Sequence, residues 1–343
     1  MILALRALGL GDLLTAVPAL RALRRHLAPA ELALALPEPL HPLAHRMCVA
    51  DEFVAVPSAV RTPPSAVHWS GPAPSLAVNL HGRGPQSTAA LAALRPRQLW
   101  AFDLPGAPRW RADEHEVRRW CRLVAGYGCP ADPTDLYLAG TAADRAGGPV
   151  VIHPGAAGAA RRWPAQRFAA VARHLAGRSL PVRITAGAGE AELAAQVAAR
   201  AGLSESEVFA GRAVTELTDL IAASRLVVCG DTGVAHLATA CRTPSVLLFG
   251  PQSPARWGPP ADEGIHQVLW HRGNGDDRAD GQRPHRALLR IQPAEVLAAA
   301  EELLAATGRF TRPTFGARGN DRSGAEVMSW SDIDDPQRPS RRF

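Results

Sequence analysis

Short apolar runs separated by glycine- and proline-rich turns recur along the whole sequence. These runs lack the alternation of apolar and polar residues that marks a strand with one face in solvent, and they are typical of parallel strands buried on both faces. The runs that we predict to be strands are 2–6, 31–36, 52–56, 76–80, 150–153, 181–186, 208–210, 226–229 and 245–249. Helical segments of mixed polarity lie between many of them, so the pattern predicts an α/β protein with mostly parallel sheets.

The strand and helix series occurs twice, which predicts two domains. A chain of 343 residues is too long for one ordinary core and fits two units of roughly 150 residues. We expect the first domain at residues 1–140 and the second at 149–308, with the connection in the Pro-, Gly- and Asp-rich stretch 128–148. Residues 309–343 are rich in Arg, Pro, Gly, Ser and Asp and are predicted to form a disordered tail.

The first strand leads into a Gly-rich turn, Gly9–Gly11, that is followed by Asp12 and a helix. A dinucleotide-binding G-x-G-x-x-G fingerprint would need a third glycine where Leu14 stands, which removes most of the support for a dehydrogenase. Open parallel sheets bind ligands at such strand-to-helix turns, so Asp12 is a candidate site residue. The alternative is that Asp12 caps the helix.

The stretch from Leu226 to Gly250 is predicted to be strand, tight turn, helix and strand. Gly233 permits the tight turn, and the free N–H groups that open the next helix can hold a phosphate. Asp231 would repel a diphosphate, so it either caps the helix or binds the hydroxyls of a ribose or sugar. The alternative is an ordinary strand–turn–helix with an Asp cap.

Two further loops carry candidate ligand-binding groups. Arg161 and Arg162 follow a small-residue loop at a helix start, where guanidinium groups bind phosphate oxygens well. His81 and Arg83 lie in a Gly-rich loop after a strand, which is either one wall of a polar cleft or a solvated loop. Because these loops follow the carboxyl ends of parallel strands, we expect them to gather at one edge of their sheet.

The composition argues against a nucleic-acid-binding, zinc-binding or membrane-spanning protein. The net charge is +6, and all 38 basic residues are Arg. This charge favours anionic ligands, but the Arg residues are scattered and no basic run is interleaved with aromatics, which argues against nucleic-acid binding. Five Cys without a C-x-x-C pair indicate a reduced, cytoplasmic chain without a zinc site. No segment reaches the ~20 apolar residues needed to span a membrane.

Four stretches together resemble glycosyltransferase family 9, the family of the ADP-heptose:lipopolysaccharide heptosyltransferases. They are GLGDLLTAVPALRALR near the start, HPGAAGAARRWPAQRF at 153–168, GAGEAELA at 187–194 and GDTGVAHLATACRTPSVLLFGPQSPARWGP at 230–259. The resemblance implies a GT-B fold, in which two Rossmann-like domains face a cleft. It also implies an inverting transfer without a metal or other cofactor, in lipopolysaccharide core biosynthesis or a related process.

The resemblance assigns a role to each matching residue. Asp12 matches the general base, and Arg6, His81 and Arg83 are acceptor-side candidates. The positions implied to bind the donor are His153, Gly155, Arg161, Glu190, Glu192, Asp231, Thr232, Gly233 and His236. Arg161 stands where many relatives have Lys, and Glu190 and Glu192 are alternative matches to the acid that binds the ribose.

We therefore expect an inverting, metal-independent glycosyltransferase that moves a heptose-like sugar from ADP-heptose to a hydroxyl acceptor, either a surface glycan or a specialised metabolite. One alternative is an enzyme of the same fold that uses another nucleotide-sugar donor. The other is a non-catalytic protein that binds a nucleotide sugar. The expected partners are the nucleotide sugar and the acceptor, and no nucleic acid. We expect a cytoplasmic monomer without a transmembrane segment, and peripheral association with a membrane surface is left open.

Overall fold

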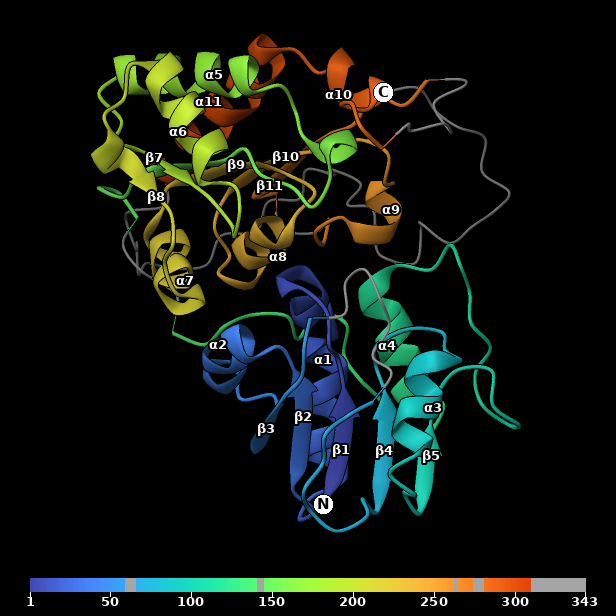
Figure 1. Cartoon of the computed structure of the whole chain (residues 1–343). Helices are drawn as coiled ribbons and strands as arrows, with labels where there is room; N and C mark the ends of the chain where they lie inside the picture. Colours follow the sequence, from blue (N-terminus) through green and yellow to red (C-terminus); the bar gives the residue numbers. More distant parts are fainter. Residues whose placement is uncertain (59–65, 141–144, 262–263, 274–280, 310–343) are drawn as a thin grey trace, which may run out of the picture.

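The computed structural model describes residues 1–58, 66–140, 145–261, 264–273 and 281–309, and it contains two separate parallel sheets (Figure 1). The first sheet has the order β3-β2-β1-β4-β5. Its strands are β1 (Ile2–Leu5), β2 (Leu32–Leu36), β3 (Glu52–Ala55), β4 (Leu76–Asn79) and β5 (Gln98–Trp100). Every pairing in it is parallel, as the unbroken apolar runs predict.

The second sheet has the order β11-β10-β9-β6-β7-β8, again with parallel pairings throughout. Its strands are β6 (Val150–His153), β7 (Val182–Thr185), β8 (Val208–Phe209), β9 (Leu226–Gly230), β10 (Ser245–Leu248) and β11 (His266–Leu269). In each sheet the strand order reverses beside a central strand, next to β1 in the first and between β6 and β9 in the second. Loops at the carboxyl ends of strands beside such a reversal form the usual ligand site of open α/β sheets.

Helices cover both faces of the two sheets. They are α1 (Leu10–His26), α2 (His41–Arg46), α3 (Gln86–Ala92), α4 (Glu116–Ala125), α5 (Ala165–Gly177), α6 (Ala191–Ala201), α7 (Val214–Ala223), α8 (Gly233–Ala240), α9 (Pro254–Trp257), α10 (Arg286–Arg290) and α11 (Pro293–Arg309). In the described part of the chain, no helix combines the length and the apolar character needed to cross a membrane.

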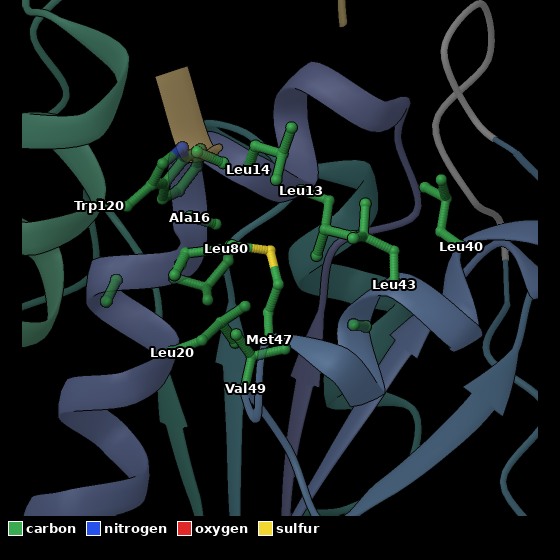
Figure 2. Packing of buried hydrophobic residues seen from close by; sticks show 14 of the residues in the cluster. Leu13, Leu14, Ala16, Leu20, Leu40, Leu43, Met47, Val49, Leu80 and Trp120 are labelled. Carbon is green, nitrogen blue, oxygen red and sulfur yellow. The ribbon is translucent and has the colours of Figure 1, made fainter. Parts of the chain in front are cut away.

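One continuous hydrophobic cluster joins the two halves of the molecule. It begins under α1, where Leu13 and Leu20 pack towards Met47 and Leu80 (Figure 2). It continues through α8 to one face of the second sheet, which contributes Val227 and other buried residues. Burial of a leucine side chain contributes about 2 kcal/mol, so this shared cluster stabilises the packing of the two halves against each other.

The structure corrects several predicted element boundaries. The acidic and then basic run 112–127 predicts a helix over its whole length, but the helix begins only at Glu116, because His115 caps it through its ring Nδ1. The predicted Gly-rich loop 81–87 ends in the first residues of α3, since the run QSTAALA after Pro85 favours a helix. Strands β5 and β11 were not predicted. The disordered tail is expected from residue 309, but helix α11 includes Arg309. The rest of the expected tail, residues 310–343, lies outside the described residues. Residues 274–280 of the polar loop 271–285 also lie outside them.

Candidate functional site

The two domains touch where the N-termini of α1 and α8 meet. A Cβ atom added to Gly11 would lie 2.7 Å from His236 Cδ2 and 3.4 Å from Gly233 Cα. The first distance is too short for a Cβ atom, so a side chain at Gly11 would displace the His236 ring, and glycine lets α1 approach α8 this closely. The turn after β1 and the turn after β9, which the sequence singles out separately, are therefore neighbours in the folded chain.

Asp12 lies at this contact as the third residue of α1. The helix begins at Leu10 and its N-cap is Gly9, so Asp12 is not the N-cap residue itself but the third helical residue of a capping box. The Asp12 Oδ2 atom instead accepts the Gly9 backbone N–H at 3.2 Å, which ties the carboxylate to the turn. The side chain keeps 27% of its surface exposed, so the carboxylate is held in place but remains within reach of a ligand.

Arg6, an expected acceptor-side residue, is buried beneath Asp12 with only 1% of its surface exposed. Its guanidinium donates to the backbone carbonyl oxygens of Asp12 at 2.8 Å and Leu80 at 2.5 Å. It also donates to Thr15 Oγ1 at 3.2 Å and lies over the Trp120 ring. Because its donors point into the protein, the structure does not present Arg6 to an acceptor.

The other two acceptor-side candidates, His81 and Arg83, lie in different environments. His81 follows β4 and is buried, and its burial, with the Arg6 charge, lowers its pKa to about 4. The ring is therefore neutral at pH 7. Arg83 extends to the surface, with 67% of its side chain exposed, and pairs with Asp103 at 2.9 Å. Of the two, only His81 lies beside the buried Arg6.

Asp231 is buried at the start of α8, where Arg161 Nη2 donates to its Oδ2 atom at 2.7 Å. The expectation that Asp231 caps α8 is wrong, because the N-cap is Thr232 and the Asp231 carboxylate points towards Arg161. Burial raises the pKa of Asp231, and the Arg161 charge opposes that rise. The negative charge of Asp12 raises the pKa of Asp231 as well, so the two carboxylates lie within electrostatic reach of each other.

Two further expected donor-binding side chains, Thr232 and His236, lie at the start of α8. Thr232 Oγ1 is buried and has no hydrogen-bond partner among the described residues. His236 is one turn into α8, and its ring centroid lies 6.0 Å from that of Trp257. Burial lowers the pKa of His236 to about 4, although the Asp12 charge acts in the opposite direction. His236 is therefore a neutral ring that can donate or accept one hydrogen bond at pH 7.

A second group of candidates gathers at the carboxyl end of β6. Glu190 Oε2 accepts the Gly187 N–H at 3.0 Å and lies 3.9 Å from His153 Nε2. A Cβ on Gly155 would stand 2.0 Å from the same oxygen, so a side chain there would displace the Glu190 carboxylate. Arg162 Nη2 lies 3.6 Å from Glu190 Oε1.

His153 itself is held by Thr185 Oγ1, 3.1 Å from its Nδ1 atom, and burial lowers its pKa. Glu192 is an exposed residue in the first turn of α6. Of the two alternative acids, the structure thus brings Glu190, and not Glu192, into the loop cluster.

Sequence reasoning missed Glu116, which is buried on α4 and binds both Arg6 and Trp120. Residues 112–127 place acids before Arg residues, as the helix dipole favours, so the pattern alone indicates an amphipathic helix and no special role for Glu116. The spacing of Glu116 and Trp120, one turn apart on a face that also carries Val117, Leu123 and Val124, is the signal that could have identified it.

The arrangement combines a reachable carboxylate with a site for negative charge. The N–H groups that open α8 can stabilise an anion, and Asp12 on the opposite domain can accept a proton from a group bound between them. Among the described residues, no group of three or more His, Cys, Asp or Glu side chains could hold a metal ion.

Sequence comparison identifies relatives. The sequence model described as glycosyltransferase family 9 (heptosyltransferase) matches residues 98–285, more than half of the chain. Lipopolysaccharide heptosyltransferase 2 of Salmonella typhimurium is 32% identical over 165 residues, which cover 45% of this chain and 46% of the relative. Lipopolysaccharide heptosyltransferase 1 of Pseudomonas aeruginosa is 31% identical over 137 residues, or 40% and 35% of the two chains. The matches thus span less than half the length of these relatives.

Solved structures share the whole architecture. The E. coli ADP-heptose lps heptosyltransferase II superposes with a TM-score of 0.68 at 19% identity, over 90% of this chain and 99% of that one. An E. coli heptosyltransferase solved with ADP gives a TM-score of 0.63 at 16% identity, over 88% and 99%. These likenesses confirm the GT-B fold predicted from the sequence.

Proposed function

Because the chain belongs to glycosyltransferase family 9, we propose that it transfers a glycosyl group from a nucleotide sugar to a hydroxyl acceptor. One observation carries this proposal: Asp12 of the first domain lies at the contact with the N-terminus of α8 in the second. A proton acceptor and a phosphate-binding helix terminus on opposite sides of one contact are what such a transfer needs.

The reaction that we propose is an inverting displacement without a metal. The acceptor oxygen attacks the anomeric carbon while Asp12 takes the hydroxyl proton. The bond between that carbon and the diphosphate oxygen breaks on the opposite face, and the nucleoside diphosphate leaves. The N–H groups of Gly233 and its successors stabilise the charge on the leaving group, which is worth several kcal/mol when donors are already in place.

The donor that we propose is ADP-heptose. The relatives are heptosyltransferases by name, and one neighbour of the same fold is called an ADP-heptose enzyme. Glu190 would take ribose hydroxyls, since its carboxylate is already fixed by the Gly187 N–H. Arg161, which is a third exposed, would offer its unpaired Nε–H to a phosphate oxygen.

We propose that the acceptor is the hydroxyl of a surface glycan or a specialised metabolite. The protein would act as a monomer in the cytoplasm, with or without peripheral contact to a membrane. All five cysteines are free, which supports a reducing compartment.

Two measurements test the proposal. A thermal-shift panel with ADP-, GDP-, UDP- and dTDP-sugars should give stabilisation by the ADP-sugars alone. The substitution Asp12→Asn should then abolish turnover while ADP still binds, because the amide keeps the size of the carboxylate but cannot take a proton. Preference for a uridine or thymidine nucleotide would overturn the donor, and unchanged turnover in Asp12→Asn would overturn the role of Asp12. ADP binding without turnover in the unmodified protein would favour a non-catalytic binding protein.

A further inference from the structure

We propose that Glu116 is a positioning residue for Asp12 and acts through Arg6. The inference rests on the proposed function, since it concerns the carboxylate that takes the acceptor proton. Glu116 opens α4, more than 100 residues from Asp12 in sequence. Its charge also reaches His236, where it opposes the lowering of the pKa by burial.

Glu116 is fixed from several sides and is only 6% exposed. Its Oε1 atom accepts from Trp120 Nε1 at 2.8 Å, and its Oε2 atom accepts from Arg119 Nη1 at 2.8 Å. Its helix is anchored to the second domain, because His115 Nε2 lies 3.1 Å from the Gly258 carbonyl oxygen. The carboxylate therefore has one defined position and one defined orientation.

Arg6 connects this carboxylate to Asp12. Its Nη2 atom lies 3.3 Å from Glu116 Oε1 and 3.6 Å from Asp12 Oδ1. One guanidinium group thus faces two carboxylates, and the buried one is the nearer. Its Nε atom also donates to the Asp12 backbone carbonyl oxygen, which fixes the first turn of α1.

Because Arg6 faces both Glu116 and Asp12, the Glu116 charge controls how strongly Arg6 attracts Asp12. A cation that pairs fully with a carboxylate stabilises its charged form and makes it a weaker proton acceptor. With Glu116 in place, Arg6 is shared between two carboxylates, and Asp12 keeps the longer contact. Without the Glu116 charge, Arg6 would turn to Asp12 and draw its carboxylate away from the cleft.

Glu116 also has a structural role, because two buried guanidinium groups face it. Arg119 is only 3% exposed and donates to its Oε2 atom, and Arg6 lies on the other side. An apolar residue at this position would remove the carboxylate that both cations share, which is strongly destabilising. A loss of kcat with an unchanged KM distinguishes an effect on Asp12 from this structural role.

The test follows ADP release from ADP-heptose, with water as the acceptor. Water oxygen bonds to the anomeric carbon, its proton passes to Asp12, and the bond to ADP breaks, which leaves free heptose and ADP. We expect Glu116→Gln to lower kcat about tenfold or more, as misplacement of a catalytic group does, with KM for ADP-heptose within about twofold of the unmodified protein. An unchanged kcat, or a loss confined to KM, would overturn the inference.

Glu114→Gln is the matched control. Glu114 lies two residues away and pairs with Arg122 at 2.6 Å rather than with Arg6. Its substitution removes the same charge from the same segment, and we expect kcat to stay within about twofold. Equal losses in both variants would mean that any charge change on this segment slows the enzyme, which would contradict a specific role for Glu116.

A double variant covers the case in which Glu116→Gln fails to fold. Glu116→Gln with Arg119→Gln removes one buried charge of each sign, so Arg6 still loses its partner without a net excess of positive charge. The same drop in kcat is expected, and a kcat equal to that of Arg119→Gln alone would overturn the inference.

The Asp12→Asn variant separates this inference from the proposed function. ADP release that Asp12→Asn leaves unchanged contradicts the proposed role of Asp12 and the inference together. Release that Asp12→Asn abolishes but Glu116→Gln leaves intact contradicts only the inference.

Discussion

Arg161 donates to the buried carboxylate of Asp231 at 2.7 Å, so the two oppositely charged side chains meet at the start of α8. The pair links the loop after β6 to the turn after β9, and both loops carry expected donor-binding residues. Within the described part of the chain, the buried Arg161 Nε has no hydrogen-bond partner.

Removing only one member of this pair should destabilise the protein. Arg161→Met leaves the buried Asp231 charge without its partner, and the full loss for such a pair is about 3–5 kcal/mol. Arg161 is a third exposed, so we expect about 2 kcal/mol after solvent screening. Urea unfolding of Arg161→Met, Asp231→Asn and the double variant would measure it.

The double variant serves as the control in that experiment. With both charges gone, its free energy of unfolding should lie above that of Arg161→Met. Strictly additive losses would show that the two side chains do not interact in solution.

Gly233→Ala should force the two domains apart. The new Cβ would lie 2.9 Å from Leu10 Cβ and 3.1 Å from the Gly11 backbone nitrogen, and the backbone cannot yield as a flexible side chain would. We expect a loss of about 1–3 kcal/mol in stability, as for other overpacked sites. ADP release should fall by about two orders of magnitude, because the Asp12 side of the cleft moves.

Gly177→Ala, where an added Cβ meets nothing within 4 Å, is the matched control and should behave like the unmodified protein. Thermal unfolding and ADP release measured on both variants would decide the point. Full activity in Gly233→Ala would show that the domains do not need this close approach.

Stability should fall below pH 6.5 in a manner that depends on His115. Burial lowers the pKa of His115 to about 4 from its ordinary 6.5. Between these values the unfolded chain binds a proton that the native ring does not, so stability is lost as the pH falls through this window. Each histidine of this kind contributes up to about 1.4 kcal/mol per pH unit.

The geometry explains why the native ring resists protonation. His115 Nδ1 accepts the Val117 N–H, while Nε2 lies against the Gly258 carbonyl oxygen, so a second ring proton would face a donor. His115→Gln should make the decline between pH 6.5 and 4 shallower by one such contribution. Urea unfolding at several pH values would detect it, and parallel curves for the two proteins would exclude His115 as a source of the decline.

The sequence predicts the strands well where both faces are buried, and poorly at the sheet edges. Strand β1 and strand β9 are uninterrupted apolar runs, and both are fully buried. Strand β5 has only three residues and begins with the exposed Gln98, and β11 is a partly exposed edge strand that begins with His266. A short, partly polar edge strand has neither a long apolar run nor clear alternation, so its pattern resembles that of a loop.

The candidate site is predictable only where its residues follow strands. Asp12 and Asp231 lie in strand-to-helix turns, and parallel topology brings such turns to the sheet edge. The partners of these residues depend on packing between distant elements. Arg6 meets Glu116 because α4 packs beside α1, and no local pattern encodes that contact. The meeting of Gly11 with Gly233 likewise depends on how the two domains dock.

The hydrophobic cluster that runs from α1 to α8 has a consequence for synthesis. The apolar surface of α1 that α8 covers, around Leu14 and neighbouring residues, leaves the ribosome more than 200 residues before α8 does. At about 5–20 residues per second, that surface stays uncovered for roughly 10–40 seconds. The nascent first half is therefore the stage at which this chain is most exposed to aggregation and most dependent on chaperones.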